Sequence, residues 1–309
     1  MEHIHYPVIV LAGPTAVGKT DLSLYLAERF NCEIISMDSM QVYRYMDIGT
    51  AKVSGEERRH VNHHLIDIRT PDQQYDAASF VDDALAAMEL IRQQDKIPLI
   101  TGGTGLYLSS LVNGLFADTG ASEVTRKKIR ARFKEQGREA SYAELKKVDP
   151  VAASNIHPND TQRLLRGLEI FYTTGTPWSV HIKKQRENRA RVFANMILIG
   201  LTREREQLHK RISERSKNMI KHGLIEEISG IIEMGYSPDL PPLQGIGYRH
   251  GLHYLNGSRS QDQMIDELAR DTRRYAKRQY TWFRQYADMS WHHPENIKKI
   301  AEKINASLC

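Results

Sequence analysis

Near its N-terminus the chain reads Gly13-Pro14-Thr15-Ala16-Val17-Gly18-Lys19-Thr20. This segment matches the pattern G-x-x-x-x-G-K-[ST] of a phosphate-binding loop at every fixed position. The apolar residues 8–11 precede it, and residues 21–27 follow it with the composition of a helix. A strand, a glycine loop and a helix in this order bind phosphate through backbone N–H groups and the positive end of the helix dipole. The sequence therefore predicts a protein that binds a diphosphate or a triphosphate.

Two side chains of this loop have predicted roles. Lys19 is expected to reach the outermost phosphate groups, and the Thr20 hydroxyl is expected to bind a Mg²⁺ ion. Mg²⁺ is therefore the predicted cofactor. Kinases, nucleotide hydrolases and group transferases share loops of this kind, so the reaction has to be inferred from the rest of the chain.

The composition is that of a soluble globular protein, with 309 residues, 40% hydrophobic and 26% charged. No apolar run approaches the ~20 residues of a membrane-spanning helix, and the N-terminus lacks the features of a signal peptide. The two cysteines, Cys32 and Cys309, do not imply a disulfide framework. We therefore expect a cytoplasmic protein without a membrane partner, and we expect it to be a monomer.

Basic residues gather in three stretches, at 126–138, 183–191 and 270–284, although the net charge is only +5. Aromatic residues, among them Tyr275 and Trp282, are interleaved with the third stretch. Cations neutralise phosphates and aromatic rings stack on unpaired bases, so a nucleic-acid partner is one interpretation. The alternative is a set of solvated helix faces whose aromatic rings pack into the core.

The order of the elements predicts an α/β fold, with a P-loop NTPase-like parallel sheet flanked by helices and a mainly helical insertion domain. Strands are expected at residues 8–11, 33–36, 65–68, 97–101 and 196–201. Helices are expected at residues 19–30, 79–94, 123–147, 158–173, 204–234, 261–282 and 295–306, with a loop at 238–248. We assign residues 1–118 and 195–309 to the P-loop core domain with its helical C-terminal part, and residues 119–194 to the insertion.

Several polar residues are expected at one edge of this sheet, because ligands of parallel sheets bind beyond the carboxyl ends of the strands. Asp38 follows the second strand and would bind magnesium or act as a base, or else cap a turn. Gln41 suits an adenine edge, or is a surface residue. The turn 101–105 permits close approach of a ligand to its glycines, or serves only to connect a strand and a helix. Arg203 would clamp a diphosphate, or begins a surface helix.

The segments together resemble the bacterial tRNA dimethylallyltransferases, also called tRNA isopentenyltransferases. The matching segments are Gly13 to Thr20, Asp38-Ser39-Met40-Gln41-Val42-Tyr43, Met46-Asp47-Ile48-Gly49-Thr50-Ala51-Lys52, Gly102-Gly103-Thr104-Gly105-Leu106-Tyr107, His157-Pro158-Asn159-Asp160, Gln162-Arg163-Leu164-Leu165-Arg166, Gly245-Ile246-Gly247-Tyr248 and Thr272-Arg273-Arg274-Tyr275-Ala276-Lys277-Arg278-Gln279-Tyr280-Thr281-Trp282-Phe283-Arg284. The ordered set is specific and covers nearly the whole chain. The basic stretch 183–191 matches no motif of the family, and its role stays open.

The resemblance implies transfer of a dimethylallyl group from dimethylallyl diphosphate to N6 of adenosine 37 in tRNAs that read codons beginning with U. The loop, Lys19 and Thr20 with its Mg²⁺ would then bind the diphosphate leaving group, as would Thr15 and Arg203. Asp38 would accept the N6 proton as general base. Residues implied to contact the tRNA anticodon stem-loop are Asp38, Ser39, Met40, Gln41, Thr101, Thr104, Gly105, Gln162, Arg163, Leu164, Leu165, Arg166, Arg274, Lys277 and Arg278.

Three other functions remain open. A small-molecule kinase would use ATP in the same loop, without a need for three basic stretches. An RNA-binding switch protein would use the loop only to sense a nucleotide. An isopentenyltransferase that acts on free AMP or ADP would not need to grip tRNA, and the basic stretches count against it. The side chains of Arg163 and Arg166 share a helix face and either contact phosphates or pair with carboxylates such as Glu169.

Overall fold

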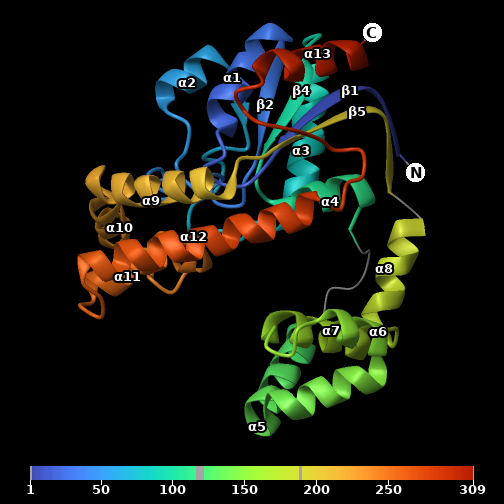
Figure 1. The fold of residues 1–309 in the computed structure, drawn as a ribbon. Coiled ribbons are helices and arrows are strands. Elements are labelled where there is room, and N and C mark those ends of the chain that lie inside the picture. The colour runs from blue at the N-terminus through green and yellow to red at the C-terminus, as the bar shows by residue number, and fades with distance from the viewer. Residues whose placement is uncertain (1, 116–121, 188–189, 309) are drawn as a thin grey trace. The chain divides into compact units, whose positions relative to one another are not determined.

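The computed structural model describes residues 2–115, 122–187 and 190–308 (Figure 1). The chain divides into two compact units. The first, here called the core unit, comprises residues 3–110 and 193–309. The second, here called the helical unit, comprises residues 1–2 and 111–192. Each unit is described by itself. Within the described residues, no helix has the length and apolar character that a membrane crossing requires.

A six-stranded sheet forms the centre of the fold, in the order β3-β2-β4-β1-β5-β6. Its strands are β1 (Glu2–Ala12), β2 (Cys32–Met37), β3 (His63–His64), β4 (Ile97–Gly102), β5 (Arg191–Leu201) and β6 (Ser290–His292). The pairings β1 with β4, β2 with β3, β2 with β4 and β5 with β6 are all parallel. The predicted α/β class with a parallel sheet flanked by helices is therefore confirmed.

The register of the central strands aligns their carboxyl ends. Ala12 of β1 and Met37 of β2 both pair with Gly102 of β4. The segments that leave these three strands therefore start side by side at one edge of the sheet. They are the phosphate-binding loop, the segment that begins at Asp38 and the glycine turn that begins at Gly103.

Helices cover both faces of the sheet. Every residue of the central strand β2 is therefore buried, as is usual for a parallel sheet. Leu22 and Leu26 of α1 (Lys19–Arg29) and Ile300 and Ile304 of α13 (Ile297–Leu308) join one buried cluster with Leu11 and other strand residues. Helix α3 (Ala77–Arg92) packs on β2 and β4 as well. The α4 helix (Gly105–Asn113) follows the glycine turn.

The C-terminal half of the core unit adds a second group of helices. It contains α9 (Arg205–Lys221), α10 (Leu224–Glu233), the 3₁₀ helix η1 (Pro241–Gln244), α11 (Tyr248–Leu255) and α12 (Gln261–Phe283). Helices α9 and α12 lie side by side (Figure 1). Tyr43 is buried in a cluster that joins these helices to the segment after β2. A short helix, α2 (Gly55–His60), precedes β3.

Three expectations about the elements are wrong, and one strand has no counterpart among them. The strand expected at 65–68 lies two residues earlier, at β3, and Leu65 and Asp67 have positive φ angles that a strand does not permit. The helix expected at 204–234 is broken at Gly223, which has a φ of 96° and separates α9 from α10. The loop expected at 238–248 contains η1, and α11 begins at its end. The short strand β6 has no strong pattern in the sequence and was not expected.

The helical unit has a small core of its own. It consists of α5 (Glu123–Val148), α6 (Pro150–Asn155), α7 (Thr161–Thr174) and α8 (Trp178–Glu187). Helix α5 is kinked at Gly137, where the φ angle is 81°. Ile129, Leu145, Leu164 and Leu168 are buried together, and Trp178 packs against them. These contacts give the segment its fold although the exposed faces of α5 are rich in charge.

Candidate active site

The phosphate-binding loop connects β1 to α1 through backbone conformations that glycine favours. Gly18 has a φ of 108° and immediately precedes Lys19, the first residue of α1. At Gly13 a Cβ atom would lie 3.1 Å from the carbonyl oxygen of Leu201, so the loop packs closely on β5. The N-terminal end of α1 therefore points its free N–H groups at the carboxyl edge of the sheet.

A cavity of about 1020 Å³ lies at this edge, and all of its lining residues belong to the core unit. The structure brings together around it the three segments that the sequence assigned to one crevice. They contribute Thr15, Ala16, Gly18, Lys19 and Thr20 from the loop, Asp38, Ser39, Met40 and Gln41 after β2, and Thr101 from β4. Thr104 and Gly105 lie next to this set, just beyond the end of β4.

Asp38 caps a turn, which is one of the alternatives that the sequence left open, and it also faces the cavity. Its Oδ1 atom accepts hydrogen bonds from the N–H groups of Met40, at 2.9 Å, and Gln41, at 3.3 Å. The carboxylate thus caps a turn, and it also lines the cavity. The N–H group of Ser39 donates to the hydroxyl of Thr104 at 3.2 Å, which ties this turn to the end of β4.

The side-chain amide of Gln41 is oriented by its neighbours. Its Oε1 atom accepts a hydrogen bond of 3.0 Å from the Ser36 hydroxyl, and its Nε2 atom donates to the carbonyl of Ala51 at 3.4 Å. Because both ends of the amide have partners, its position in the cavity wall is fixed.

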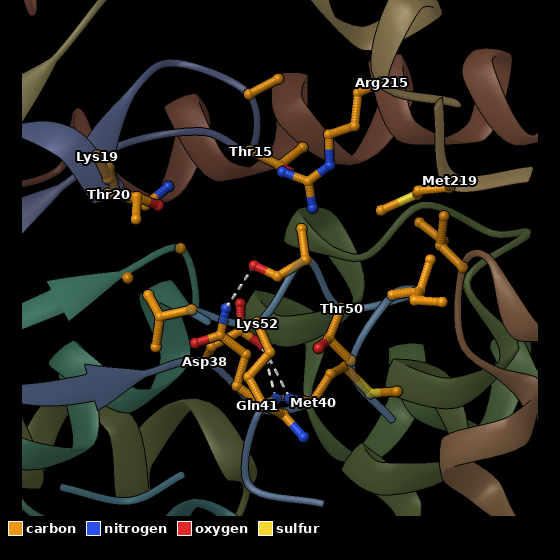
Figure 2. A pocket seen from close by; sticks show the side chains of 18 of the residues that line it. Thr15, Lys19, Thr20, Asp38, Met40, Gln41, Thr50, Lys52, Arg215 and Met219 are labelled. Atoms are coloured by element: carbon orange, nitrogen blue, oxygen red, sulfur yellow. Dashed lines mark hydrogen bonds between the residues drawn. The ribbon is translucent and has the colours of Figure 1, made fainter. Parts of the chain in front are cut away.

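The cavity concentrates positive charge. Desolvation lowers the pKa of Lys19 to about 8; the charge of Asp38 opposes this shift and that of Arg215 adds to it. Burial likewise lowers the pKa of the Arg215 guanidinium, while Asp38 raises it. Figure 2 shows Arg215 extending from α9 toward the side of the cavity that carries Asp38. Groups whose charged forms are poorly solvated gain most from an anionic ligand.

Among the lining residues outside the sites that the sequence assigned are three polar side chains, Arg211, Arg215 and Gln279. Arg211 and Arg215 lie one turn apart on α9, and the Nε atom of Arg211 donates to the carbonyl of Ala16 at 2.8 Å. Gln279 lies on α12 and contacts the loop at Thr15. The i, i+4 spacing of the two arginines indicates a shared helix face. Nothing in the sequence indicates that this face turns toward a loop nearly two hundred residues away.

Arg203 supports the loop from another side. Its Nε atom donates to the carbonyl of Val17 at 2.8 Å, and its Nη1 atom lies 3.2 Å from a carboxylate oxygen of Glu295. Its backbone N–H donates to the hydroxyl of Tyr280. Arg203 is absent from the lining of the described cavity, although Gly18 is close to its guanidinium.

Comparisons with known proteins agree over nearly the whole chain. A sequence profile described as IPP transferase matches residues 41–286. The chain is 48% identical to a protein named tRNA dimethylallyltransferase of Desulfotalea psychrophila, over 100% of this chain and 98% of that one. The chain belongs to the IPP transferase family. It is therefore a transferase.

Solved structures of the IPP transferase family have the same fold. A full-length tRNA isopentenylpyrophosphate transferase from Bacillus halodurans is 39% identical, with a TM-score of 0.71, and the match covers 98% of this chain and 96% of that one. A eukaryotic dimethylallyltransferase described as acting on tRNA is 29% identical, with a TM-score of 0.78, over 99% of this chain and 77% of that one.

The basic residues that the resemblance to this family assigned to RNA fall in both units. In the helical unit, α7 carries the segment 162–166, whose Arg163 is exposed and lies 3.6 Å from Asp160, while Arg166 lies 3.7 Å from Glu169. Leu164 belongs to the buried core instead of the surface. In the core unit Arg274, Lys277 and Arg278 are exposed along α12, and Arg278 lines the cavity.

The aromatic residues of α12 mostly pack inward. Phe283 is fully buried, and the Tyr280 hydroxyl accepts a hydrogen bond from the Arg203 backbone. Trp282 lies so close to Gly105 that a Cβ atom there would be 2.5 Å from its side chain. Core packing is therefore correct for Phe283, whereas Tyr280 and Trp282 are half-buried against the residues named. The basic side chains remain on the outside.

The residues around the loop fit a magnesium ion that is bound together with a diphosphate. Mg²⁺ takes oxygen ligands and usually keeps waters and phosphate oxygens around it. Thr20 and Asp38 both line the cavity, and their hydroxyl and carboxylate groups are oxygen ligands of the kind that Mg²⁺ binds. In the described part of the chain, no group of three or more His, Cys, Asp or Glu residues could hold a metal ion without such a ligand.

Proposed function

We propose that this protein transfers a dimethylallyl group from dimethylallyl diphosphate to N6 of adenosine 37 in tRNAs that read codons beginning with U. The products are N6-dimethylallyladenosine and diphosphate. One observation carries the proposal: the phosphate-binding loop and Asp38 line the same cavity, in a chain whose relatives are named tRNA dimethylallyltransferases. A diphosphate and an adenine can therefore meet there.

The loop and α9 would bind the diphosphate. The N–H groups at the start of α1, the ammonium group of Lys19 and the guanidinium groups of Arg211 and Arg215 surround the loop. As the bond between the allylic carbon and the diphosphate oxygen breaks, negative charge grows on the leaving group. Fixed positive groups stabilise that charge more in the transition state than in the substrate. Arg203 would act by supporting the loop at Val17.

A magnesium ion, with Thr20 as its protein ligand, would supply further neutralisation of the diphosphate charge when bound. Thr15 would contact the same diphosphate from the loop, since it lines the cavity.

An apolar wall beside the arginines would take the dimethylallyl group. Met219 follows Arg215 by one turn of α9 and lines the cavity, as does Met40 (Figure 2). The Met40 methyl group is held against Gly245, where a Cβ atom would lie 3.0 Å from it. Met219 and Met40 pack in the same hydrophobic cluster as Ile48 and Ile246. A substrate with an anionic head and a short apolar tail suits a wall of this composition.

The segment after β2 would bind and activate the adenine. The lone pair of N6 attacks the allylic carbon, the carbon–oxygen bond breaks, and the N6 proton passes to the Asp38 carboxylate. The fixed amide of Gln41 would hydrogen-bond the adenine edge after the base leaves its stack. Ser39, Met40, Thr101, Thr104 and Gly105 would shape the rest of this subsite.

Basic helices of both units would hold the anticodon stem-loop. Arg274, Lys277 and Arg278 present cations along α12, and Arg163 and Arg166 present two cations on α7, beside Gln162 and the half-buried Leu165. Contacts of these side chains with phosphates would offset the few kcal/mol that it costs to unstack one base. The helical unit would therefore bind RNA rather than the diphosphate.

The direct test is an incubation with labelled dimethylallyl diphosphate, Mg²⁺ and unmodified tRNA that carries A36-A37-A38. We expect the label to appear in tRNA. Nucleoside analysis should place it in N6-dimethylallyladenosine at position 37. A parallel tRNA with A37 replaced by G37 serves as the control and should stay unlabelled. Transfer of phosphate from ATP without labelled tRNA would contradict the proposal and favour a kinase.

A further inference from the structure

Gln279 connects the phosphate-binding loop to the glycine turn after β4. Its Oε1 atom accepts a hydrogen bond of 2.9 Å from the N–H group of Thr15. Its Nε2 atom donates a hydrogen bond of 2.9 Å to the carbonyl of Gly103. Gln279 is only 4% exposed; its bond to Gly103 is buried, and its bond to Thr15 is partly buried. One amide therefore satisfies one group in each of two loops that lie far apart in the sequence.

The glycine turn is shaped to admit α12 at this point. A Cβ atom at Gly103 would lie 2.0 Å from the Nε2 atom of Gln279, and one at Gly105 would lie 2.5 Å from Trp282. A side chain at Gly103 would displace the Gln279 amide, and one at Gly105 would meet the Cβ atom of Trp282 on the helix itself. The close approach places the amide of Gln279 between the two loops instead of beside them.

We propose that Gln279 is a positioning residue that fixes the phosphate-binding loop for the diphosphate. It acts through Thr15, whose N–H group it engages, and it anchors that contact to the sheet through Gly103. Removal of the amide would leave the partly buried N–H group of Thr15 and the buried carbonyl of Gly103 without this partner, and the loop would lose its tie to the glycine turn. The inference rests on the proposed function for the identity of the diphosphate substrate.

Helix α12 contributes further residues to the cavity. Tyr275 and Arg278, the neighbours of Gln279 on α12, also line the cavity. Burial raises the pKa of Tyr275 to about 12, and the charge of Asp38 adds to this shift, while hydrogen bonds with Thr104 and Gln279 oppose it. The helix that we propose to bind RNA on its exposed side thus holds the diphosphate loop on its buried side.

The test measures binding of inorganic diphosphate and of tRNA separately. Gln279→Met keeps the size of the side chain and removes both hydrogen bonds, and Gln279→Asn keeps an amide that is too short to reach both loops. We expect each variant to bind inorganic diphosphate about tenfold more weakly in titration calorimetry, with tRNA affinity within about twofold of the original protein. In turnover assays KM for dimethylallyl diphosphate should rise more than kcat falls.

Met264→Ala is the matched control, because Met264 is fully buried on α12 and does not line the cavity. It should lower thermal stability without weakening diphosphate binding. Unchanged diphosphate affinity in either folded Gln279 variant would overturn the inference. So would an equal loss of diphosphate affinity in Met264→Ala. If the original protein binds diphosphate but leaves tRNA unlabelled, the proposed function fails while the calorimetric result still decides the role of Gln279.

Discussion

The Tyr248 hydroxyl donates a hydrogen bond of 2.7 Å to the Glu227 carboxylate. The same carboxylate accepts the N–H groups of Asp47, Ile48 and Gly49, at 2.9, 2.7 and 3.1 Å. The tyrosine ring lies against Gly49, where a Cβ atom would be 2.5 Å from it. Helices α10 and α11 thus hold residues 47–49, which form one wall of the cavity.

Replacement of Glu227 by glutamine should therefore destabilise the core unit. The NH₂ group of the new amide would face at least one backbone N–H group, so a donor would meet a donor. We expect the free energy of unfolding to fall by about 2 kcal/mol, measured by urea denaturation. Tyr248→Phe removes only one of the four hydrogen bonds and should cost ~1 kcal/mol. Equal losses in the two variants would contradict the importance of the backbone contacts.

Asp38→Asn should abolish turnover with little effect on the fold. Asparagine keeps an oxygen that can accept the N–H groups of Met40 and Gln41, but it cannot take up a proton at neutral pH. We expect kcat to fall by at least about 100-fold, since a general base typically contributes 10²–10⁴. The affinity for tRNA, measured by filter binding, should stay near its original value. Full turnover in a folded Asp38→Asn variant would remove the proposed role of the carboxylate.

Binding of diphosphate should weaken as the pH rises above about 8. The pKa of Lys19 is lowered to about 8 by desolvation, so its ammonium group loses its proton within the alkaline range of an ordinary assay. Only the charged form attracts the anion, and we expect affinity for inorganic diphosphate to fall about tenfold between pH 7 and pH 9. Lys19→Arg stays charged throughout and serves as the control. The same pH dependence in Lys19→Arg would assign the effect to another group.

Met219→Ala should relax the choice of prenyl donor. Met219 lines the cavity one turn after Arg215, so the diphosphate should stay in place while space opens beyond its tail. We expect the ratio of kcat/KM for dimethylallyl over geranyl diphosphate to fall at least about tenfold. Met234→Ala, at a position that is 60% exposed and outside the cavity, should leave the ratio unchanged. No change in Met219→Ala would place the prenyl group elsewhere.

The sequence by itself determined the class of the fold and the position of the phosphate-binding loop. Both depend on residues that are close in the chain, since a strand, a glycine loop and a helix follow one another directly. The glycine at position 18 also indicates a positive φ angle, which the structure has. The position of Asp38 at the end of β2 follows in the same way from strand periodicity. The predicted bounds of a strand and of a helix are wrong where one residue adopts a positive φ angle, at Leu65 and at Gly223.

Only the tertiary structure decided which distant residues complete the site. Arg211 and Gln279 reach the loop from α9 and α12, and no local pattern indicates which face of a helix a remote loop will meet. The sequence does not distinguish RNA-stacking rings from core residues at Trp282 and Phe283; in the structure Phe283 is fully buried and Trp282 is half-buried against Gly105. The physical reason is that these contacts depend on how helices pack across the sheet edge, and packing is a property of the whole core rather than of any one segment.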